Sequence, residues 1–403
     1  MKKILMLILD GMPDAKERDT TLEIAKIDNL NKLASDGLCG MIENNINEHP
    51  GSGESHFHLL GYEQDEYPGR GYAEAIGIGI QPKTDELCLR ANFATVSEKV
   101  EEKAEGQFGP KLILKDRRAA RETTGLKELA QSISEINIEG MTVRLHKSLG
   151  HRAVLTINNV ESSLNIIGND PHKINVEVPE VKPTSNDNKA AKTVATLNKW
   201  SNEVYKILKD HKANTERKVP ANYVIFRGPG KYKYVKTLKE KQGLDGAVVA
   251  GSPIVKGIGK ILDMEVPDLH TATADYNTDL RDKTLKALEL LEKKDLVLLH
   301  VKATDIAAHD KNPEMKKAMV EKVDREVLGR ILEYVDFNKT VLAVVADHPT
   351  SLETGDHEAG FIPFIFYTLG IEKNNIESYN EKQCKNGPII SMDGVMEKLI
   401  SLR

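Results

Sequence analysis

Three aspartates lie at the ends of short apolar runs that have the composition of buried strands. Asp10 closes KILMLILD, Asp305 closes DLVLLHVKATD, and Asp347 closes TVLAVVAD. In an open α/β sheet, ligands bind outside the carboxyl ends of the strands. We therefore expect the three carboxylates to lie close together at one sheet edge. Carboxylates that are buried together repel one another and lose solvation, so cations are their expected partners.

Three histidines accompany these aspartates. His309 follows Asp305 by four residues, so one helical turn would place both on one side. His348 is adjacent to Asp347, and His357 follows nine residues later. Oxygen and imidazole ligands together favour Zn or Mn over Mg or Ca. Although a single aspartate of this kind is more often a helix cap and a single histidine is more often structural, the joint pattern predicts a metal site.

A serine supplies the candidate nucleophile. Ser52 lies in PGSGESHFHLLGY (50–62), where a proline and two glycines shape a turn before an apolar helical pattern. The N-terminus of a helix favours phosphate oxygens, and coordination to a dication would lower the pKa of the hydroxyl. Together with the aspartates and histidines, Ser52 makes enough ligands for two metal ions, the usual apparatus for displacement at phosphorus. On local sequence alone, Ser52 could instead be a helix cap, and Ser55 competes as nucleophile.

Buried strands and intervening helices must position these residues. Continuous apolar runs without alternation suit parallel strands covered on both faces, and they occur at 3–10, 246–252, 295–305 and 340–348. Apolar residues at helical spacing occur at 22–36, 278–294 and 313–334. Strands that alternate with helices predict a doubly wound α/β core.

The middle of the chain has a different pattern. Residues 87–96, 141–147 and 153–158 have the character of alternating strands, and 194–208 has the spacing of an amphipathic helix. We interpret this segment as an α+β domain inserted into the α/β core. The predicted domains are therefore a metal-binding core, 1–83 plus 233–403, and an inserted substrate or cap domain, 84–232.

Composition excludes several classes of function. The 403 residues carry 56 basic and 61 acidic side chains, which argues against a nucleic-acid partner. No apolar stretch approaches the ~20 residues of a membrane span. The three cysteines are far apart and form no disulfide framework or thiolate zinc motif. We expect a soluble cytoplasmic protein without a membrane partner, and the sequence predicts no oligomeric state.

Longer segments resemble the archaeal-type 2,3-bisphosphoglycerate-independent (cofactor-independent) phosphoglycerate mutases of the alkaline phosphatase superfamily. The matching segments cover nearly the whole chain, and they include LILDGMPD, PGSGESHFHLLGY, YPGRGYAEAIGIGI, LCLRANFATV, DRRAAR, FRGPGKY, GLDGAVVAGSPIVKGIGKILDM, HVKATDIAAHD and ADHPTSLETGDH. The resemblance implies an alkaline-phosphatase-like, mostly parallel sheet core with an inserted α+β cap. It also implies two divalent metal ions, Mn or Zn, with Mg or Co as alternatives.

The resemblance assigns roles to particular residues. One metal ion would take Asp10, Ser52, Asp347 and His348, and the other would take Asp305, His309 and His357. Basic residues would hold the phosphate and carboxylate of the substrate, because the planar fork of arginine suits a bidentate grip on such groups. The matching positions are Arg70, Arg117, Arg121, Arg152, Arg227 and Lys256. Each of these could instead form a structural ion pair.

The implied activity is the interconversion of 3-phosphoglycerate and 2-phosphoglycerate in glycolysis or gluconeogenesis, through a phosphoserine on Ser52. Closure of the cap would exclude water from that intermediate. Four positions depart from the family pattern, namely Gly53, Ala153, Lys173 and Pro349. These departures leave open a phosphatase, or a phosphotransferase that acts on another small acceptor such as homoserine. An inactive metal-binding scaffold is the further alternative.

Overall fold

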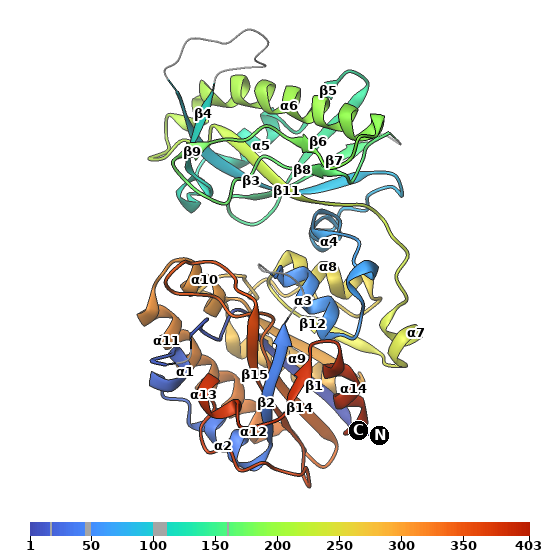
Figure 1. The fold of residues 1–403 in the computed structure, drawn as a ribbon, viewed down its shortest axis with the longest axis vertical. Helices are drawn as coiled ribbons and strands as arrows, with labels where there is room; N and C mark the ends of the chain where they lie inside the picture. The colour runs from blue at the N-terminus through green and yellow to red at the C-terminus, as the bar shows by residue number, and fades with distance from the viewer. Residues whose placement is uncertain (17, 45–49, 100–110, 159–160) are drawn as a thin grey trace. The chain divides into compact units, whose positions relative to one another are not determined.

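The computed structural model describes residues 1–403 except 17, 45–49, 100–110 and 159–160 (Figure 1). The chain forms two compact units, Met1–Tyr67 with Tyr234–Arg403, and Pro68–Lys233. The predicted boundary at residue 84 is therefore wrong by one element, because residues 68–83 belong to the second unit. The reason is helix α4 (Arg70–Gly77), which packs against β3 (Leu87–Glu98) so closely that a Cβ on Gly71 would lie 2.2 Å from the Cys88 carbonyl oxygen.

Within the residues that the structure describes, a seven-stranded sheet forms the centre of the first unit. Its strands, in spatial order, are β12 (Gly246–Val249), β13 (Leu296–Val301), β1 (Lys3–Leu9), β14 (Thr340–Val345), β15 (Gly360–Tyr367), β2 (Leu38–Asn44) and β16 (Ile389–Ser391). The first four strands run parallel, and β15 is antiparallel to both of its neighbours. Residues 4–9 of β1 are all 0% exposed, and because successive side chains point to opposite faces, both faces of the sheet are covered. The predicted α/β core is thus confirmed.

The helices of the first unit connect these strands. They are α1 (Thr21–Ile24), α2 (Asp28–Asp36), α3 (Ser52–Leu59), η1 (Gln64–Glu66), α7 (Leu238–Gln242), α8 (Pro253–Ile261), α9 (Leu280–Leu291), α10 (Ala303–His309), α11 (Pro313–Val323), η4 (Asp324–Leu328), α12 (Gly329–Tyr334), α13 (Glu381–Cys384) and α14 (Gly394–Ser401). The single helix predicted over 22–36 is two helices. The Asp324 carboxylate accepts from the backbone N–H groups of Asn29 and Leu30, at 3.2 and 2.8 Å, and so starts α2 there.

An antiparallel sheet and the long helix α6 (Asn188–Lys209) form the second unit, with α6 lying along one face of the sheet (Figure 1). The strands are β3, β4 (Leu112–Asp116), β5 (Glu135–Ile138), β6 (Met141–Lys147), β7 (Arg152–Asn158), β9 (Val176–Glu177) and β11 (Tyr223–Gly230), with the short pair β8 (Ile166–Ile167) and β10 (Lys182–Pro183). The remaining helices are α5 (Leu126–Ser132), η2 (Ala119–Arg121) and η3 (Lys212–Asn214). Trp200 of α6 is fully buried and packs edge-on against Phe226 of β11.

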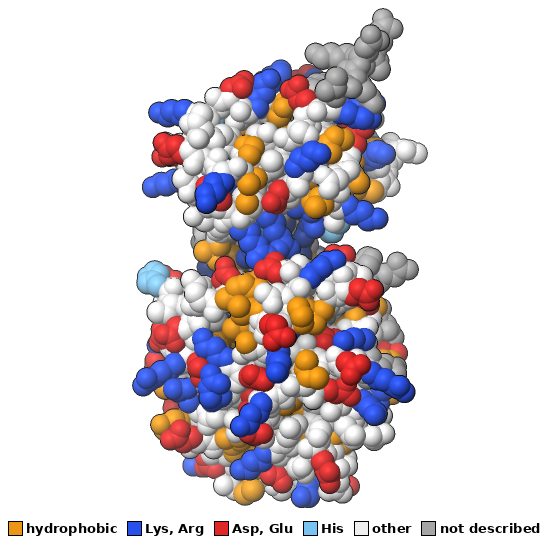
Figure 2. Space-filling view, turned by 90° about the vertical axis from the view of Figure 1, so that its left-hand side faces the viewer, with side chains coloured by type: hydrophobic (Ala, Val, Ile, Leu, Met, Phe, Trp, Pro, Cys, Tyr) orange, Lys and Arg blue, Asp and Glu red, His pale blue; other side chains and the backbone are white. Residues whose placement is uncertain are grey.

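The surface carries side chains of both charges (Figure 2). On the face drawn in Figure 2, basic and acidic side chains are interspersed over much of the surface, and basic side chains also gather in one continuous patch. Within the described part of the chain, none of the helices combines the length and the apolar character that crossing a membrane requires.

Candidate metal centre and active site

The three predicted aspartates meet at the carboxyl ends of β1, β13 and β14. Asp10 directly follows β1, Asp347 lies two residues beyond β14, and Asp305 lies in the first turn of α10, which begins two residues after β13. The parallel register of the three strands brings their ends to one level, and all three side chains are 0% exposed. The backbone N–H of Gly11 donates to Asp347 Oδ1 at 3.1 Å, which ties two of the strand ends together.

One group of possible metal ligands comprises Asp10, Asp347 and His348, whose ligand atoms all lie within 4.8 Å of one another. His348 Nε2 lies 3.7 Å from Asp10 Oδ1 and 3.2 Å from Asp347 Oδ2. Ser52 Oγ lies 3.2 Å from the same nitrogen. The structure therefore gathers all four residues that the sequence assigned to one metal ion.

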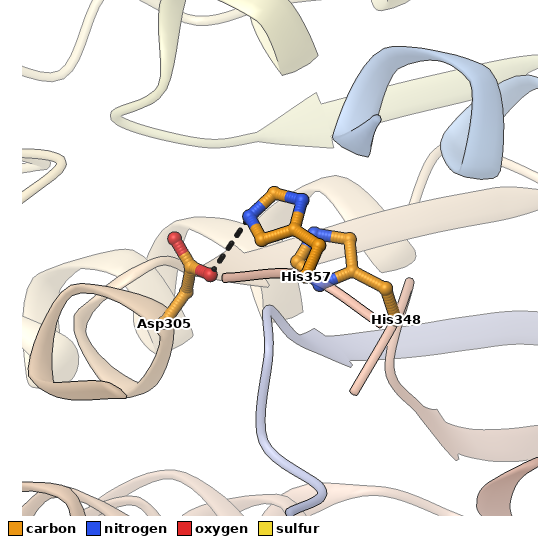
Figure 3. A group of neighbouring side chains, drawn as sticks. All are labelled: Asp305, His348 and His357. Atoms are coloured by element: carbon orange, nitrogen blue, oxygen red, sulfur yellow. Dashed lines mark ion pairs between the residues drawn. The ribbon is translucent and has the colours of Figure 1, made fainter. Parts of the chain in front are cut away.

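The second group comprises Asp305, His348 and His357 (Figure 3). Asp305 Oδ1 lies 3.3 Å from His357 Nε2, and Asp305 Oδ2 lies 3.3 Å from His309 Nε2. The rings of His348 and His357 stack with centroids 3.6 Å apart. Figure 3 shows the two rings close together near Asp305. The structure thus brings the second predicted ligand set together as well, with His348 between the two groups.

The hydrogen bonds of His309 and His357 fix the orientation of both rings beside Asp305. His309 Nδ1 lies 2.6 Å from the Gly355 carbonyl oxygen, and His357 Nδ1 lies 2.9 Å from that of Pro50. Carbonyl oxygens only accept, so each Nδ1 carries a proton, and a ring that has no second proton presents a lone pair at Nε2. These two Nε2 atoms lie 3.1 Å apart beside the Asp305 carboxylate. Two imidazole nitrogens beside a buried carboxylate are groups that suit a metal ion.

The aspartates are held in the charged form that metal binding needs. Burial by itself would raise the pKa of Asp347, but the neighbouring His348 and the further cations hold it well below its usual range. Burial opposes ionisation of Asp305 too, and His309 and Lys302 hold its pKa low. Asp347 Oδ2 is buried and accepts no hydrogen bond from the described residues, which is a further mark of a cation ligand.

Ser52 is the first residue of α3, and Gly51 takes the cap position without a side-chain cap bond. The helix-cap alternative is therefore wrong for Ser52. Ser55 faces elsewhere, since its Oγ accepts from Asn44 Nδ2 at 3.5 Å. At Gly53, where the family pattern has an acid, a Cβ would lie 2.1 Å from the Tyr67 hydroxyl oxygen, so a side chain here requires Tyr67 to shift.

Sequence reasoning missed four residues that contact this constellation. Lys302 Nζ lies 2.8 Å from both carboxylate oxygens of Asp10, and His300 Nε2 lies 2.9 Å from Asp10 Oδ2. His56 Nδ1 lies 2.5 Å from the Ser52 carbonyl oxygen, and Thr350 Oγ1 donates to Asp305 Oδ1 at 3.0 Å. The signal for two of them was present, because His300 and Lys302 are basic residues at alternate positions in an apolar run that ends in Asp305.

A buried network holds the loop that follows β1. Lys316 Nζ lies 2.6 Å from Asp14 Oδ1 and donates to the Thr350 carbonyl oxygen at 3.1 Å. Glu381 accepts from the Asp14 N–H at 2.9 Å and from Thr20 Oγ1 at 2.6 Å. Burial raises the pKa of Glu381 to about 6. The network joins the loop after Asp10 to the loop after His348 and so supports both ligand-bearing segments.

Predicted substrate-binding arginines cluster within the second unit. Arg70 Nε donates to Glu74 Oε1 at 2.9 Å, and Arg90 Nη1 contacts both oxygens of the same carboxylate at 2.6 and 2.7 Å. Although burial opposes ionisation, the two arginines lower the pKa of Glu74 to about 2. Arg70 therefore takes part in an ion pair within this cluster, and Arg90 is a member of the cluster that the sequence did not indicate.

A second carboxylate, that of Asp170, forms ion pairs with two more of these arginines. Arg117 binds it in bidentate fashion, with Nε and Nη2 at 2.9 and 2.8 Å from the two oxygens, and Arg227 contacts the same group. Burial and the positive charge of Arg70 lower the pKa of Arg227 to about 9. The cluster therefore has more positive charge than these two carboxylates balance, and a bound anion would relieve the repulsion.

Arg121, Arg152 and Lys256 are the remaining predicted substrate-binding residues. Burial and neighbouring arginines lower the pKa of Arg152 to about 10. Burial, Arg152 and further arginines including Arg118 and Arg121 lower that of His151 to about 2. These residues therefore share one electropositive neighbourhood. Lys256 belongs to the first unit, on α8.

The fold and the site together define a class. An α/β core that gathers three buried carboxylates, three imidazoles and a serine at the carboxyl edge of its sheet has the parts of a metal-dependent phosphoryl-transfer enzyme. A family model described as 2,3-bisphosphoglycerate-independent phosphoglycerate mutase matches residues 34–214. The protein of that name from Methanopyrus kandleri is 37% identical over 98% of this chain and 94% of its own length. The chain therefore belongs to the family of 2,3-bisphosphoglycerate-independent phosphoglycerate mutases, as its sequence indicated.

Further relatives and solved structures agree. The 2,3-bisphosphoglycerate-independent phosphoglycerate mutase 1 of Methanocaldococcus jannaschii is 32% identical over 99% of this chain and 97% of its own length. The cofactor-independent phosphoglycerate mutase of Thermoplasma acidophilum has a structure that aligns with a TM-score of 0.62 at 31% identity, over 100% of both chains. A protein from Pyrococcus horikoshii aligns with a TM-score of 0.78 at 26% identity, over 100% of this chain and 97% of its own.

Proposed function

We propose that this protein is an isomerase that interconverts 3-phosphoglycerate and 2-phosphoglycerate, with Ser52 as the phosphoryl carrier. The observation that carries the proposal is the position of Ser52 Oγ, 3.2 Å from His348 Nε2 and 3.4 Å from Lys302 Nζ, beside both groups of possible metal ligands. Membership of the mutase family supplies the substrate class. A cytoplasmic location stays a prediction.

Two divalent cations, Mn or Zn with Mg or Co as alternatives, are proposed as cofactors. Asp10, Ser52, Asp347 and His348 would hold one, and Asp305, His309 and His357 would hold the other. When bound, such ions stabilise the negative charge that develops on oxygen during phosphoryl transfer. The proposal is supported by the Nε2 atoms of His309 and His357, which lie 3.1 Å apart beside Asp305, and by the buried Oδ2 of Asp347, which accepts no hydrogen bond from the described residues.

The residues of the chain would act in two half-reactions. In the first, a bond forms between Ser52 Oγ and phosphorus, the bond between phosphorus and the substrate oxygen breaks, and the released glycerate oxygen gains the proton that the serine loses. In the second, a bond forms between phosphorus and the other glycerate oxygen, the bond between Ser52 Oγ and phosphorus breaks, and the serine oxygen regains the proton that this hydroxyl loses. The first turn of α3 supplies N–H groups that have no partner within the helix, which favours phosphate oxygens there.

The basic residues would keep glycerate bound between the two half-reactions. We assign this role to the predicted set, Arg70, Arg117, Arg121, Arg152, Arg227 and Lys256, and we add Arg90. The lowered pKa values of Arg152 and Arg227 support an anion in their neighbourhood. Retention of glycerate separates a mutase from a phosphatase, because water that reached the phosphoserine would release free phosphate.

The test is an assay of the purified protein with 3-phosphoglycerate and Mn²⁺, without 2,3-bisphosphoglycerate. We expect 2-phosphoglycerate, and we expect Ser52→Ala to reduce its formation by about 10³-fold or more. Ser55→Ala is the matched control, because it removes a hydroxyl from the same helix and should retain activity. Release of phosphate without 2-phosphoglycerate would favour the phosphatase alternative, and full activity of Ser52→Ala would refute the assigned nucleophile.

A further inference from the structure

Lys302 touches both groups of possible metal ligands and the serine oxygen at once. Its Nζ lies 2.8 Å from Asp10 Oδ1 and Oδ2, 2.8 Å from Asp305 Oδ2 and 3.4 Å from Ser52 Oγ. Its side chain is only 12% exposed. None of the roles assigned by resemblance to the family includes this residue.

The backbone places Lys302 at this point. β13 pairs in parallel with β1 up to Val301 opposite Leu9, so the next residues of the two strands, Lys302 and Asp10, lie side by side at the sheet edge. His300 lies two residues earlier, and its Nε2 contacts the same carboxylate at 2.9 Å. The end of β13 therefore presents two basic side chains to one aspartate, and Lys302 is the one that continues to Ser52.

A fixed ammonium at this point opposes metal binding. It lies 2.8 Å from an oxygen of Asp10 and of Asp305, two of the three ligand carboxylates, so it attracts the same oxygens as a dication and repels the dication itself. An apolar side chain of the same length would remove that repulsion. Metal affinity therefore does not account for a lysine here, whereas contact with the serine oxygen does.

We propose that Lys302 is a catalytic residue, which donates hydrogen bonds to the Ser52 oxygen and to the phosphoryl oxygens during transfer, and that its charge weakens metal binding in return. It stays protonated throughout, so the bonds that form and break are those between phosphorus and the two oxygens. Charge-assisted donors aimed at developing negative charge are worth far more in a buried site than in water. The inference rests on the proposed function for its substrate.

The competing explanation is structural, with Lys302 acting only as a counter-ion that keeps the carboxylates in place. The two explanations predict opposite changes in metal affinity. If Lys302 organises the ligands, its removal lets Asp10 and Asp305 separate, and metal binding weakens. If it acts on the serine oxygen at the expense of metal binding, its removal strengthens metal binding while turnover falls.

Lys302→Met separates these outcomes, because it keeps the length of the side chain and removes the charge. We expect calorimetric titration with Mn²⁺ alone to give an affinity about tenfold higher than that of the wild type. We expect kcat with 3-phosphoglycerate to fall about 10²-fold or more. Lys293→Met, at an exposed position, is the matched control and should change neither quantity.

Weaker Mn²⁺ binding by Lys302→Met, or an unchanged kcat, would overturn the proposal. Lys302→Arg retains the positive charge, so its Mn²⁺ affinity should stay within about threefold of the wild type, and this measurement stands even if the methionine variant does not fold. If the wild type released phosphate instead of forming 2-phosphoglycerate, the proposed function would fail alone. The Mn²⁺ affinities and the rate of phosphate release would still decide the role of Lys302.

Discussion

At the residue scale, the tautomers of the histidines connect local structure to chemistry. Backbone carbonyl oxygens accept the Nδ1 protons of His309 and His357, so the Nε2 atom of each ring lies toward Asp305. In metal sites generally, the hydrogen-bond partner of one ring nitrogen of a histidine determines which of its two nitrogens can bind the metal. The ligand set is therefore prepared by the loops that supply Gly355 and Pro50, as well as by the ligands themselves.

Glu381 makes a pH dependence testable at this scale. Its pKa rises from an ordinary 4.5 to about 6 on folding, so the folded site favours the protonated carboxyl. This contribution to stability is complete below pH 4.5 and is lost as pH rises through about 6. We compare the free energy of unfolding of Glu381→Gln with that of the wild type at each pH. Between pH 4.5 and pH 7, this difference should change by about 2 kcal/mol in favour of the variant.

Urea unfolding at a series of pH values measures this difference. Glu377→Gln, at an exposed position in the same segment, should follow the wild type at every pH. A difference between Glu381→Gln and the wild type that did not grow with pH would contradict the role of burial at Glu381.

At the scale of elements, one arginine supports a segment of unusual backbone. Ala119, Ala120 and Arg121 have φ values of 44°, 56° and 57°, in the left-handed region that costs energy for residues other than glycine. Arg217 is 7% exposed and donates to the carbonyl oxygens of Ala119 and Glu122 at 3.0 Å each, as well as to that of Thr124. These bonds hold the segment that carries two of the predicted substrate-binding arginines.

Removal of that support should lower both stability and substrate affinity. We expect Arg217→Met to lower the free energy of unfolding by about 2–4 kcal/mol, because several buried carbonyl oxygens lose their donor. We also expect KM for 3-phosphoglycerate to rise more than kcat falls, since the displaced segment carries Arg117 and Arg121 rather than the serine. Denaturant unfolding and steady-state kinetics measure the two effects.

The control for this prediction is Arg144→Met. Arg144 is a partly exposed arginine of β6 in the same unit, and it pairs with Glu135 at the surface. Its loss should cost less than about 1 kcal/mol and leave KM unchanged. A KM for Arg217→Met equal to that of Arg144→Met would show that Arg217 does not position substrate-binding groups.

At the scale of the whole molecule, the chain divides its chemistry between two units. Both groups of possible metal ligands belong to the first unit, and the arginine cluster belongs to the second. The second unit has its own hydrophobic core, and its ends meet, since the N–H of Lys231 donates to the Pro68 carbonyl oxygen at 3.1 Å. The chain has a single tryptophan, Trp200, which is buried in that core and so reports on the second unit alone.

This division predicts where metal ions stabilise the protein. With Mn²⁺ at about 100 times its dissociation constant, we expect about 2.7 kcal/mol of added stability per site, confined to the first unit. Calorimetry should then show a transition that moves upward with Mn²⁺ and returns with a chelator. The fluorescence transition of Trp200 should move much less. If Mn²⁺ moved only the Trp200 transition, the metal ions would bind in the second unit, which would contradict this prediction.

The sequence by itself predicted the α/β core, the family and the residues of the two candidate metal groups. These inferences depend on local patterns, because a buried parallel strand is a continuous apolar run and its carboxyl end marks the binding edge. The seven residues Asp10, Ser52, Asp305, His309, Asp347, His348 and His357 could be named because their types are unusual at such positions.

Only the tertiary structure decided which other side chains meet them. Lys302 and Ser52 are 250 residues apart in the chain, and His300 and Asp10 are 290 apart, so no local pattern relates them. The same holds for Asp170, which was not predicted and which pairs with Arg117 and Arg227. Periodicity reports which face of an element is buried, whereas the contacts of a charged group depend on how distant elements pack, and that is determined by the fold as a whole.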